Sequence, residues 1–292
     1  MKVSDLFKQD KQTLSFEFFP PKTEEQEAHL FQVISELKNF NPDFISVTYG
    51  AMGRNRDKTF YWAKKIKQEF GIEPVAHLTC VAATKYGIKN QLGELESIGV
   101  QNILALRGDP PEGEKDFVPP ADGFSYAKEL ISFIKQNKPQ ICLGVAGFPE
   151  VHPSLKDQSI DIKYLKEKVD AGAEYIITQL FFDNSHFFSF VEKCRNSGIT
   201  VPVIPGIMPI TSVKQIKRLT QICGAKIPQN LLNLLEEHVD DHEAIQKIGV
   251  DHAISQCEEL LKAKVPGLHF FVMNQSGPVS KIISRLQQFP VF

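Results

Sequence analysis

Short apolar segments recur eight times along the 292-residue chain, and a longer amphipathic segment follows each of the first seven. The strand-like segments are residues 14–19, 44–47, 74–78, 102–106, 141–146, 175–180, 201–205 and 268–272. The segments between them carry apolar residues at helical spacing and are long enough for crossover helices. Consecutive strands are therefore expected to run parallel.

Eight strand–helix units in series predict an α/β fold, a (β/α)8 TIM barrel with a parallel eight-stranded sheet. The expected helices are residues 25–37, 59–70, 86–98, 126–135, 162–171, 185–196 and 213–220. A helical insert is predicted at 227–261, between strands seven and eight, and a closing helix at 278–288. We expect residues 1–292 to form a single barrel domain.

An open doubly wound sheet is the alternative architecture. That fold usually places a glycine-rich nucleotide-binding turn after its first strand. Here the first strand ends in Phe-Phe-Pro-Pro, and the chain contains neither G-x-G-x-x-G nor G-x-x-x-x-G-K-[ST]. The missing glycines favour the barrel.

Composition excludes several classes of partner. A formal charge of −2 offers no basic surplus for nucleic acid or an anionic membrane. No stretch approaches the roughly 18 apolar residues of a membrane span. The five cysteines form no C-x-x-C pair, which argues against a disulfide scaffold and fits a reducing compartment. We expect a cytoplasmic protein with a small-molecule ligand and no membrane contact.

Polar residues stand at the ends of the predicted strands, where barrels carry their active sites. They are Glu17, Thr48, Tyr49, His77, Thr79, Arg107, Asp109, Gln179 and Gly206. Side chains in a strand alternate between faces, so His77 and Thr79 should point the same way. Burying so many polar groups is costly without a ligand. The pattern therefore indicates a binding pocket.

Glu17 lies between phenylalanines in Leu-Ser-Phe-Glu-Phe-Phe. Such flanks would desolvate the carboxylate and raise its pKa, which suits a general acid near neutral pH. The spacing equally allows a solvent-facing residue or a buried ion pair with Lys22 or Arg107. These interpretations stay open from the residues alone.

Other candidates also have a structural alternative. In Arg107-Gly108-Asp109, the charged residues suit a ligand and the glycine allows close approach, although a salt bridge within the segment explains them as well. His77 taken alone fits a core histidine, and Cys80 a packed thiol. His238 and His242 have a zinc-compatible spacing, but a solvated helix face explains them better. Residues 148–153 form either a phosphate-binding loop or an ordinary connection.

Eight blocks, in order, resemble the 5,10-methylenetetrahydrofolate reductase family, in its bacterial type with the catalytic domain only. They are Phe-Glu-Phe-Phe-Pro-Pro-Lys at 16–22, Ser-Val-Thr-Tyr-Gly at 46–50, His-Leu-Thr-Cys at 77–80, Leu-Arg-Gly-Asp at 106–109, Pro-Glu-Val-His-Pro at 149–153, Lys-Val-Asp-Ala-Gly-Ala at 168–173, Thr-Gln at 178–179 and Pro-Gly-Ile-Met-Pro at 205–209. Together they span most of the chain, which makes the resemblance specific.

The resemblance implies a flavoprotein that reduces 5,10-methylenetetrahydrofolate to 5-methyltetrahydrofolate for methionine synthesis and one-carbon metabolism. Non-covalent FAD would first take electrons from NADH or NADPH in a ping-pong mechanism, and no metal is implied. Because the cofactor carries the redox chemistry, no Rossmann fingerprint is needed. Family members are commonly homo-oligomers, so the same is expected here.

The resemblance also implies residue roles. Glu17 matches the general acid that protonates the folate nitrogen as the five-membered ring opens, and Asp109 matches the residue that binds the pterin and stabilises the iminium. The implied FAD-binding positions are Thr48, His77, Arg107, Gly108, Asp109, Tyr126, Ala146, His152, Asp161 and Lys168. The implied folate-binding positions are Glu17, Asp109, Gln179, Gln215, Leu219 and Gln275.

Some positions depart from the family pattern. Leu219 stands where some bacterial members have a phenylalanine that stacks on the ligand, and Gln275 where an arginine often meets the folate tail. A neutral amide at that point weakens a charge-assisted contact. Tyr164 and Glu167 replace residues that are often Asn and Arg. These departures concern binding at the periphery and leave the implied reaction intact.

Two further hypotheses belong to other classes. A flavin-free lyase or aldolase would need a Schiff-base lysine or metal ligands at the strand ends, and no lysine lies within those ends. A non-catalytic partner subunit would be expected to lose Glu17 or Asp109, and both are present.

Overall fold

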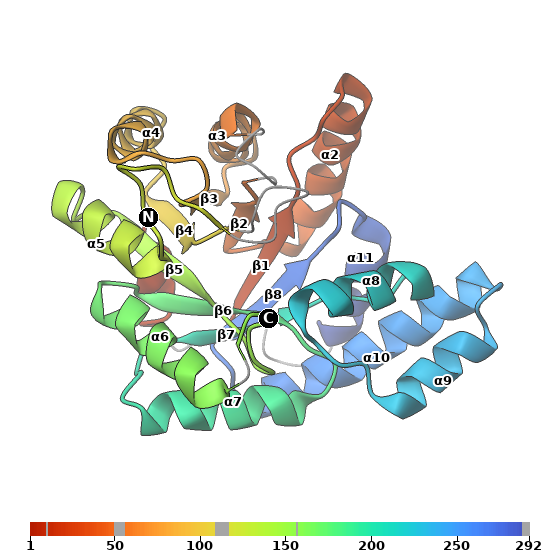
Figure 1. Cartoon of the computed structure of the whole chain (residues 1–292). Helices are drawn as coiled ribbons and strands as arrows, with labels where there is room; N and C mark the ends of the chain where they lie inside the picture. The colour runs from red at the N-terminus through yellow and green to blue at the C-terminus, as the bar shows by residue number, and fades with distance from the viewer. Residues whose placement is uncertain (10, 50–55, 109–116, 156, 288–292) are drawn as a thin grey trace.

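The structure, a computed structural model, describes residues 1–9, 11–49, 56–108, 117–155 and 157–287. Eight parallel strands form a closed barrel in sequence order (Figure 1). They are β1 (Thr13–Phe18), β2 (Phe44–Val47), β3 (Glu73–Thr79), β4 (Asn102–Leu106), β5 (Cys142–Gly147), β6 (Tyr175–Leu180), β7 (Val203–Ile207) and β8 (Gly267–Phe271). Pairing of β8 with β1, from Thr13 opposite Gly267 to Glu17 opposite Phe271, closes the barrel. The predicted fold is confirmed.

Helices surround the barrel on the outside (Figure 1). They are α2 (Glu24–Leu37), α3 (Arg56–Lys65) continued by a π-helical turn (Ile66–Phe70), α4 (Lys85–Ser97), α5 (Ala127–Asn137), α6 (Gln158–Asp170), α7 (Asn184–Asn196), α8 (Val213–Cys223), α9 (Gln229–Glu237), α10 (His242–Lys262) and α11 (Ser276–Leu286), with a short 3-10 turn at Lys38–Phe40. The predicted insert between strands seven and eight is α9 with α10. No helix within the described ranges combines the length and the apolar character that crossing a bilayer requires.

Local sequence explains where many of these helices begin. A Ser, Thr or Asp precedes the first turn of six described helices, and its side chain accepts a hydrogen bond from a backbone N–H of that turn. These residues are Thr23, Thr84, Asp157, Asp183, Ser212 and Asp241. Such caps satisfy N–H groups that have no partner inside the helix.

Strand alternation divides the apolar core into two parts. One side of each strand packs against the helices, as Phe16 and Phe18 do in β1. The other side fills the barrel, where Phe44 of β2, Tyr175 of β6 and Ile204 of β7 belong to one cluster. The barrel is therefore a packed interior with room for chemistry only near its ends.

The amino-terminal end of the barrel is closed by a helix that the sequence did not predict, α1 (Val3–Leu6). Val3 and Leu6 join the apolar cluster inside the barrel. The Val3 N–H donates to Asn102 Oδ1 at 2.8 Å, and Asn102 Nδ2 donates to Glu73 Oε1 at 3.0 Å. A four-residue helix is too short to show helical periodicity, which explains why it was missed.

The insert helix α10 packs tightly against the loop that follows β7. Gly249 makes this approach possible, since a Cβ built there would lie 1.9 Å from the Ile210 carbonyl oxygen. Ile210 and Ile245 share a third apolar cluster with residues of α8 and α9. The insert thereby supports the segment that connects β7 to α8.

Candidate active site at the carboxyl end of the barrel

Glu17 points into the barrel near the carboxyl ends of the strands and is 8% exposed. Its Oε2 accepts a hydrogen bond from Ser46 Oγ of β2 at 3.1 Å. The same oxygen lies 3.2 Å from His77 Nε2 of β3 and 3.4 Å from His269 Nε2 of β8. Side chains from β1, β2, β3 and β8 thus meet at one carboxylate oxygen.

The surroundings of Glu17 differ from those that its sequence neighbours suggested. Phe16 and Phe18 lie on the opposite face of β1, in the layer between the barrel and the helices. Neither Lys22 nor Arg107 is its ion-pair partner, because the ionisable groups beside it are His77 and His269. The alternation of side chains in a strand explains both corrections.

The predicted rise in the Glu17 pKa is wrong in direction. Burial inside the barrel does raise the pKa of this carboxyl, but the charge of His77 and the hydrogen bond from His269 outweigh it. The pKa of Glu17 is therefore held well below its usual range. Nearby positive charge and hydrogen bonds to the charged form both stabilise a carboxylate, so Glu17 rests in its deprotonated form.

His269 is the residue at this site that strand-end reasoning missed. It lies on the inner face of β8, two residues before the strand ends, with 0% exposure. Its Nδ1 lies 2.8 Å from Ser15 Oγ, and the Ser15 hydroxyl also lies 3.2 Å from the Leu268 carbonyl oxygen. A polar residue in the strand Gly-Leu-His-Phe-Phe was the available signal.

Three buried polar atoms near Glu17 have no hydrogen-bond partner among the described residues. They are Thr48 Oγ1, Thr79 Oγ1 and His77 Nε2, the last lying near Glu17 without hydrogen-bond geometry. All three stand at or just beyond the carboxyl ends of β2 and β3. Buried polar groups are rarely left unpaired. The residues present therefore fit a polar cofactor or substrate at this end of the barrel.

A second polar group lies where β5 leads into α6. Lys168 Nζ donates to the Ala146 carbonyl oxygen at 2.7 Å, and the His152 N–H donates to Asp161 Oδ2 at 2.9 Å. Burial lowers the pKa of Lys168 to about 8, although the nearby Asp161 carboxylate opposes this shift. Burial raises the pKa of Asp161. Lys168 belongs to the last turn of α6, so the feature that suits an anionic group here is the buried cation itself.

The segment after β4 is described only in part, since Asp109 lies outside the described residues. The Arg107 guanidinium lies over the Phe117 ring, with its carbon 6.0 Å from the ring centre. Gly108 has φ +85°, and a Cβ there would lie 2.4 Å from Val81 Cγ2. The left-handed backbone and the close packing against Val81, in the loop after β3, therefore explain why a glycine stands at this position. The group that approaches Gly108 closely is a protein side chain and not a ligand. Tyr126, 54% exposed, stands at the start of α5.

Apart from Glu17 and Asp109, the predicted folate positions lie on or beside three elements, β6, α8 and α11. Gln179 lies near the end of β6, where its Oε1 accepts from the Leu180 N–H at 2.9 Å. In α8, Gln215 Oε1 lies 3.4 Å from Thr211 Oγ1, and Leu219 packs against the cluster formed with α9. Gln275 is exposed at the start of α11. Only Gln179 of these belongs to a barrel strand.

The remaining candidates carry no metal site. His238 follows the end of α9 and His242 begins α10, so the two histidines do not share the helix face that their spacing suggested. No group of three or more potential ligands is assembled within the described ranges. Burial raises the pKa of the Cys80 thiol to about 12, as expected for an inert packed thiol.

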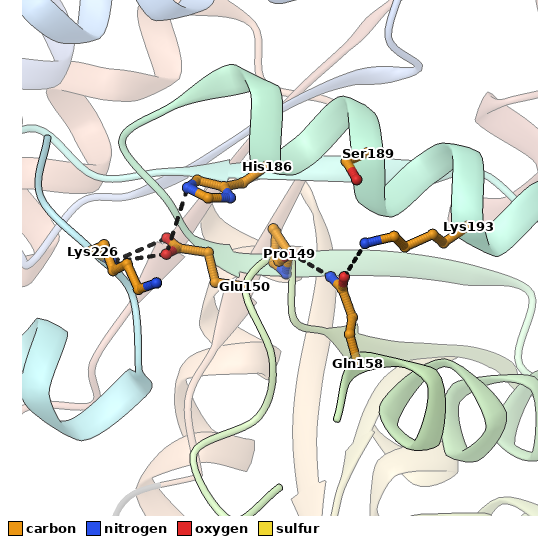
Figure 2. Close-up of a pocket in the computed structure, with 7 residues that line it drawn as sticks. All are labelled: Pro149, Glu150, Gln158, His186, Ser189, Lys193 and Lys226. Carbon is orange, nitrogen blue, oxygen red and sulfur yellow. Dashed lines mark hydrogen bonds and ion pairs between the residues drawn. The ribbon is translucent and has the colours of Figure 1, made fainter. Parts of the chain in front are cut away.

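A separate polar pocket lies beside the loop after β5 (Figure 2). Seven residues line it: Pro149, Glu150, Gln158, His186, Ser189, Lys193 and Lys226. Figure 2 shows Glu150 between His186 and Lys226, where its carboxylate accepts from the Lys226 N–H at 3.0 Å. The volume of this pocket, about 100 Å³, is small compared with the roughly 300–1,000 Å³ that is typical of small-molecule binding sites. Glu150 is best explained as an anchor for the loop.

Barrels of this architecture hold their active sites at the carboxyl ends of the strands, and the chain has the arrangement of a (β/α)8-barrel enzyme with a carboxylate between two histidines. It belongs to the methylenetetrahydrofolate reductase family, which it matches over residues 2–287.

Relatives of known name extend this result. "Methylenetetrahydrofolate reductase (NADH) 1" of Arabidopsis thaliana is 38% identical over 98% of this chain and 50% of its own length. The "5,10-methylenetetrahydrofolate reductase" of Escherichia coli is 36% identical over 90% of this chain and 86% of its own. The chain spans about half the length of the plant and yeast relatives it matches.

Solved structures agree on the fold. A Clostridium thermocellum protein, described as binding two copies of 5-methyl-5,6,7,8-tetrahydrofolic acid, has a TM-score of 0.67 at 18% identity and covers 96% of this chain, which covers 95% of that one. A 2,3-dimethylmalate lyase has a TM-score of 0.56 at 8% identity, with 98% and 85% covered. At such identities the likeness concerns architecture alone.

Proposed function

We propose that the chain reduces 5,10-methylenetetrahydrofolate to 5-methyltetrahydrofolate with electrons from NADH or NADPH, in a ping-pong reaction that serves methionine synthesis. The observation that carries this proposal is the buried carboxylate of Glu17 at the barrel mouth, in a chain of this family. The names of the Arabidopsis and Escherichia coli relatives support the same reaction.

The proposed cofactor is FAD. When bound, FAD would accept two electrons from the nicotinamide and pass them to the folate carbon. The unpaired Thr48 Oγ1 and Thr79 Oγ1 support a polar ring system at the mouth, and Lys168 supports an anionic group beside α6. We assign FAD binding to Thr48, His77, Arg107, Gly108, Asp109, Tyr126, Ala146, His152, Asp161 and Lys168.

The proposed folate site joins the mouth to α8. We assign folate contacts to Glu17, Asp109, Gln179, Gln215, Leu219 and Gln275. Glu17 would protonate the folate nitrogen whose bond to the one-carbon unit breaks, and Asp109 would face the cationic iminium that results. Because the resting Glu17 is a carboxylate, it has to gain a proton before it acts as an acid. Exclusion of water by the bound folate favours that uptake, since desolvation favours the neutral carboxyl.

Glu17→Gln separates the two halves of the reaction. The amide keeps the shape of the side chain but has no acidic proton, so we expect folate-dependent reoxidation of the protein-bound FAD to fall by about 10²–10⁴-fold. Reduction of the same FAD by NADH should proceed at the wild-type rate. Anaerobic stopped-flow absorbance measures both steps. A wild-type protein that takes up no FAD, or a variant that retains both steps, contradicts the proposal.

A further inference from the structure

Val151, in the loop between β5 and α6, has a backbone conformation that β-branched residues rarely adopt. Its φ is +112°, and of the non-glycine residues with positive φ in the described part of the chain it alone is β-branched. A positive φ brings the Cβ atom of an L-residue too close to neighbouring backbone atoms. Such residues persist only where their surroundings hold them, and they gather at functional sites. The contacts on either side of Val151 therefore indicate what this strain serves.

The two residues before it are tied to neighbouring elements (Figure 2). The Pro149 carbonyl oxygen accepts a hydrogen bond from Gln158 Nε2 of α6 at 2.7 Å. The Glu150 carboxylate accepts from the Lys226 N–H in the connection between α8 and α9, at 3.0 Å to Oε1 and 3.2 Å to Oε2. His186 Nε2 of α7 lies 3.8 Å from Glu150 Oε2, which is too long for a hydrogen bond. The backbone N–H of Lys226 is therefore the contact that fixes Glu150.

The residue after Val151 is tied to α6, where proposed FAD positions lie. The His152 N–H donates to Asp161 Oδ2 at 2.9 Å, and the Phe148 ring meets the His152 imidazole edge-on with centres 4.6 Å apart. Val151 therefore lies between two fixed points, Glu150 and His152. A negative φ at Val151 would rotate these points relative to each other about the N–Cα bond. The His152 N–H could then face Asp161 only if the Glu150 carboxylate gave up its own contact.

The contact of Glu150 is suited to balance this strain. A hydrogen bond to a carboxylate is shorter and stronger than one between neutral groups, and the Glu150 side chain is only 6% exposed, so water competes little for it. The connection that carries Lys226 packs closely against the loop. A Cβ built on Gly224 would lie 3.4 Å from the Val151 carbonyl oxygen and 3.3 Å from Pro153 Cγ. The donor is thus a backbone group held in place beside the loop, and not a mobile side chain.

We propose that Glu150 is a positioning residue for the flavin, an inference that rests on the proposed FAD dependence. It holds Val151 in the strained conformation, which keeps the His152 N–H on Asp161 before the cofactor binds. FAD then binds a loop that is already ordered and does not have to supply the free energy of ordering it. Without the Glu150 carboxylate, the loop relaxes toward a negative φ. Only a fraction of the molecules then present the FAD-binding arrangement, and the apparent affinity falls by that fraction.

The affinity for FAD measures this fraction. The strain of one such residue corresponds to a factor of about 5–150 in the equilibrium of the loop. We expect Glu150→Ala to raise the dissociation constant of FAD by a factor in this range, measured by flavin fluorescence as the flavin-free protein is titrated with FAD. Glu150→Gln keeps an oxygen that accepts the Lys226 N–H, so it should retain most of the affinity. A wild-type affinity in Glu150→Ala, or an equal loss in both variants, would overturn the proposal.

A second substitution separates backbone strain from lost packing. Glycine adopts positive φ without steric cost, so Glu150→Ala combined with Val151→Gly should recover most of the FAD affinity that Glu150→Ala loses. Val151→Ala in the same background removes the branch but keeps a Cβ, and it should recover less than glycine does. If the double variant with glycine bound FAD as weakly as Glu150→Ala alone, Glu150 would act through packing only and the proposal would fail.

Two matched variants test whether the effect is specific to this contact. Lys226→Ala removes the side chain but keeps the backbone N–H, so the affinity for FAD should not change. Glu192→Ala removes an exposed glutamate of α7, next in sequence to the pocket residue Lys193, and it tests whether the loss of any negative charge on this side matters. A loss of FAD affinity in either variant would contradict the assigned role of Glu150.

Hydrogen exchange of the His152 N–H tests the loop without FAD. NMR of the whole flavin-free protein follows this amide, which is protected by its bond to Asp161. Exchange should speed up in Glu150→Ala by about the same factor as the loss of affinity, and little in Glu150→Gln. An unchanged exchange rate in Glu150→Ala would refute the anchoring. A wild-type protein that takes up no FAD would refute the proposed function, while the exchange result would still decide whether Glu150 holds the loop.

Discussion

Replacement of Gly249 by alanine sets two effects of opposite sign against each other. Alanine is favoured over glycine inside a helix by about 1 kcal/mol, which would stabilise α10. The new Cβ would however stand 1.9 Å from the Ile210 carbonyl oxygen and 2.7 Å from its carbonyl carbon. The first distance is about 1.6 Å less than the roughly 3.5 Å at which nonbonded atoms pack. Either α10 or the loop after β7 has to move.

The clash should win. Overpacking typically costs about 1–3 kcal/mol and sometimes more, and here both atoms in conflict belong to backbone. A contact as short as 1.9 Å belongs at the upper end of that range, about 3 kcal/mol. After the gain of about 1 kcal/mol from alanine is subtracted, we expect a net loss of about 2 kcal/mol in the free energy of unfolding. Gly93, an exposed glycine of α4 with no atom within 4 Å of a built Cβ, is the matched control. Gly93→Ala should gain about 0.5–1 kcal/mol.

Urea unfolding followed by the fluorescence of Trp62, the single tryptophan, measures both variants. Trp62 is 1% exposed in α3, so unfolding should change its emission. The denaturant dependence of the unfolding free energy should stay constant, which would show that only stability changed. A Gly249→Ala protein as stable as the wild type would refute the packing argument. A destabilised Gly93→Ala protein would refute the use of helix propensity here.

Three further outcomes follow from the structure. FAD affinity, measured by flavin fluorescence, should fall as the pH rises above about 8, because the Lys168 ammonium then loses its proton; Lys168→Met should remove this dependence. Asn102→Ala should cost about 1–3 kcal/mol in urea unfolding and expose the amino terminus to limited proteolysis, because it removes the partner of the Val3 N–H. A thiol reagent should label Cys223 first in the native protein, since the other four cysteines are buried; mass spectrometry of the labelled peptides checks the order.

Much of the barrel could be predicted because its signal is local and repeated. Strands β2, β4 and β6 have the predicted bounds, and the other strands begin within two residues of the predicted positions. Apolar runs separated by helical spacing specify this order without knowledge of any contact. The 3-10 and π-helical turns and α1 carry no such signal, because they are too short or depend on packing against the finished barrel.

The candidate site was predicted in position but not in electrostatics. Glu17 was placed at the mouth from the end of its strand, and the structure puts it there. Its pKa was assigned from adjacent phenylalanines, yet neighbours in a strand lie on opposite faces. The groups that decide its charge come from β3 and β8, and His269 is 252 positions away in sequence. Such partners appear only when the barrel closes.

The short helix α1 covers the amino-terminal end of the barrel. Its Val3 and Leu6 join the packed interior at the end from which the strands begin, so a ligand reaches Glu17 from the carboxyl ends of the strands. If the nicotinamide nucleotide and the folate are too large to occupy this end of the barrel together, the first has to leave before the second can bind. On the proposed function, the ping-pong order of the reaction would then follow from shared access at the carboxyl end of the barrel as much as from the cofactor. Removal of α1 would not create a second route to the site, since the packed barrel interior still separates its two ends.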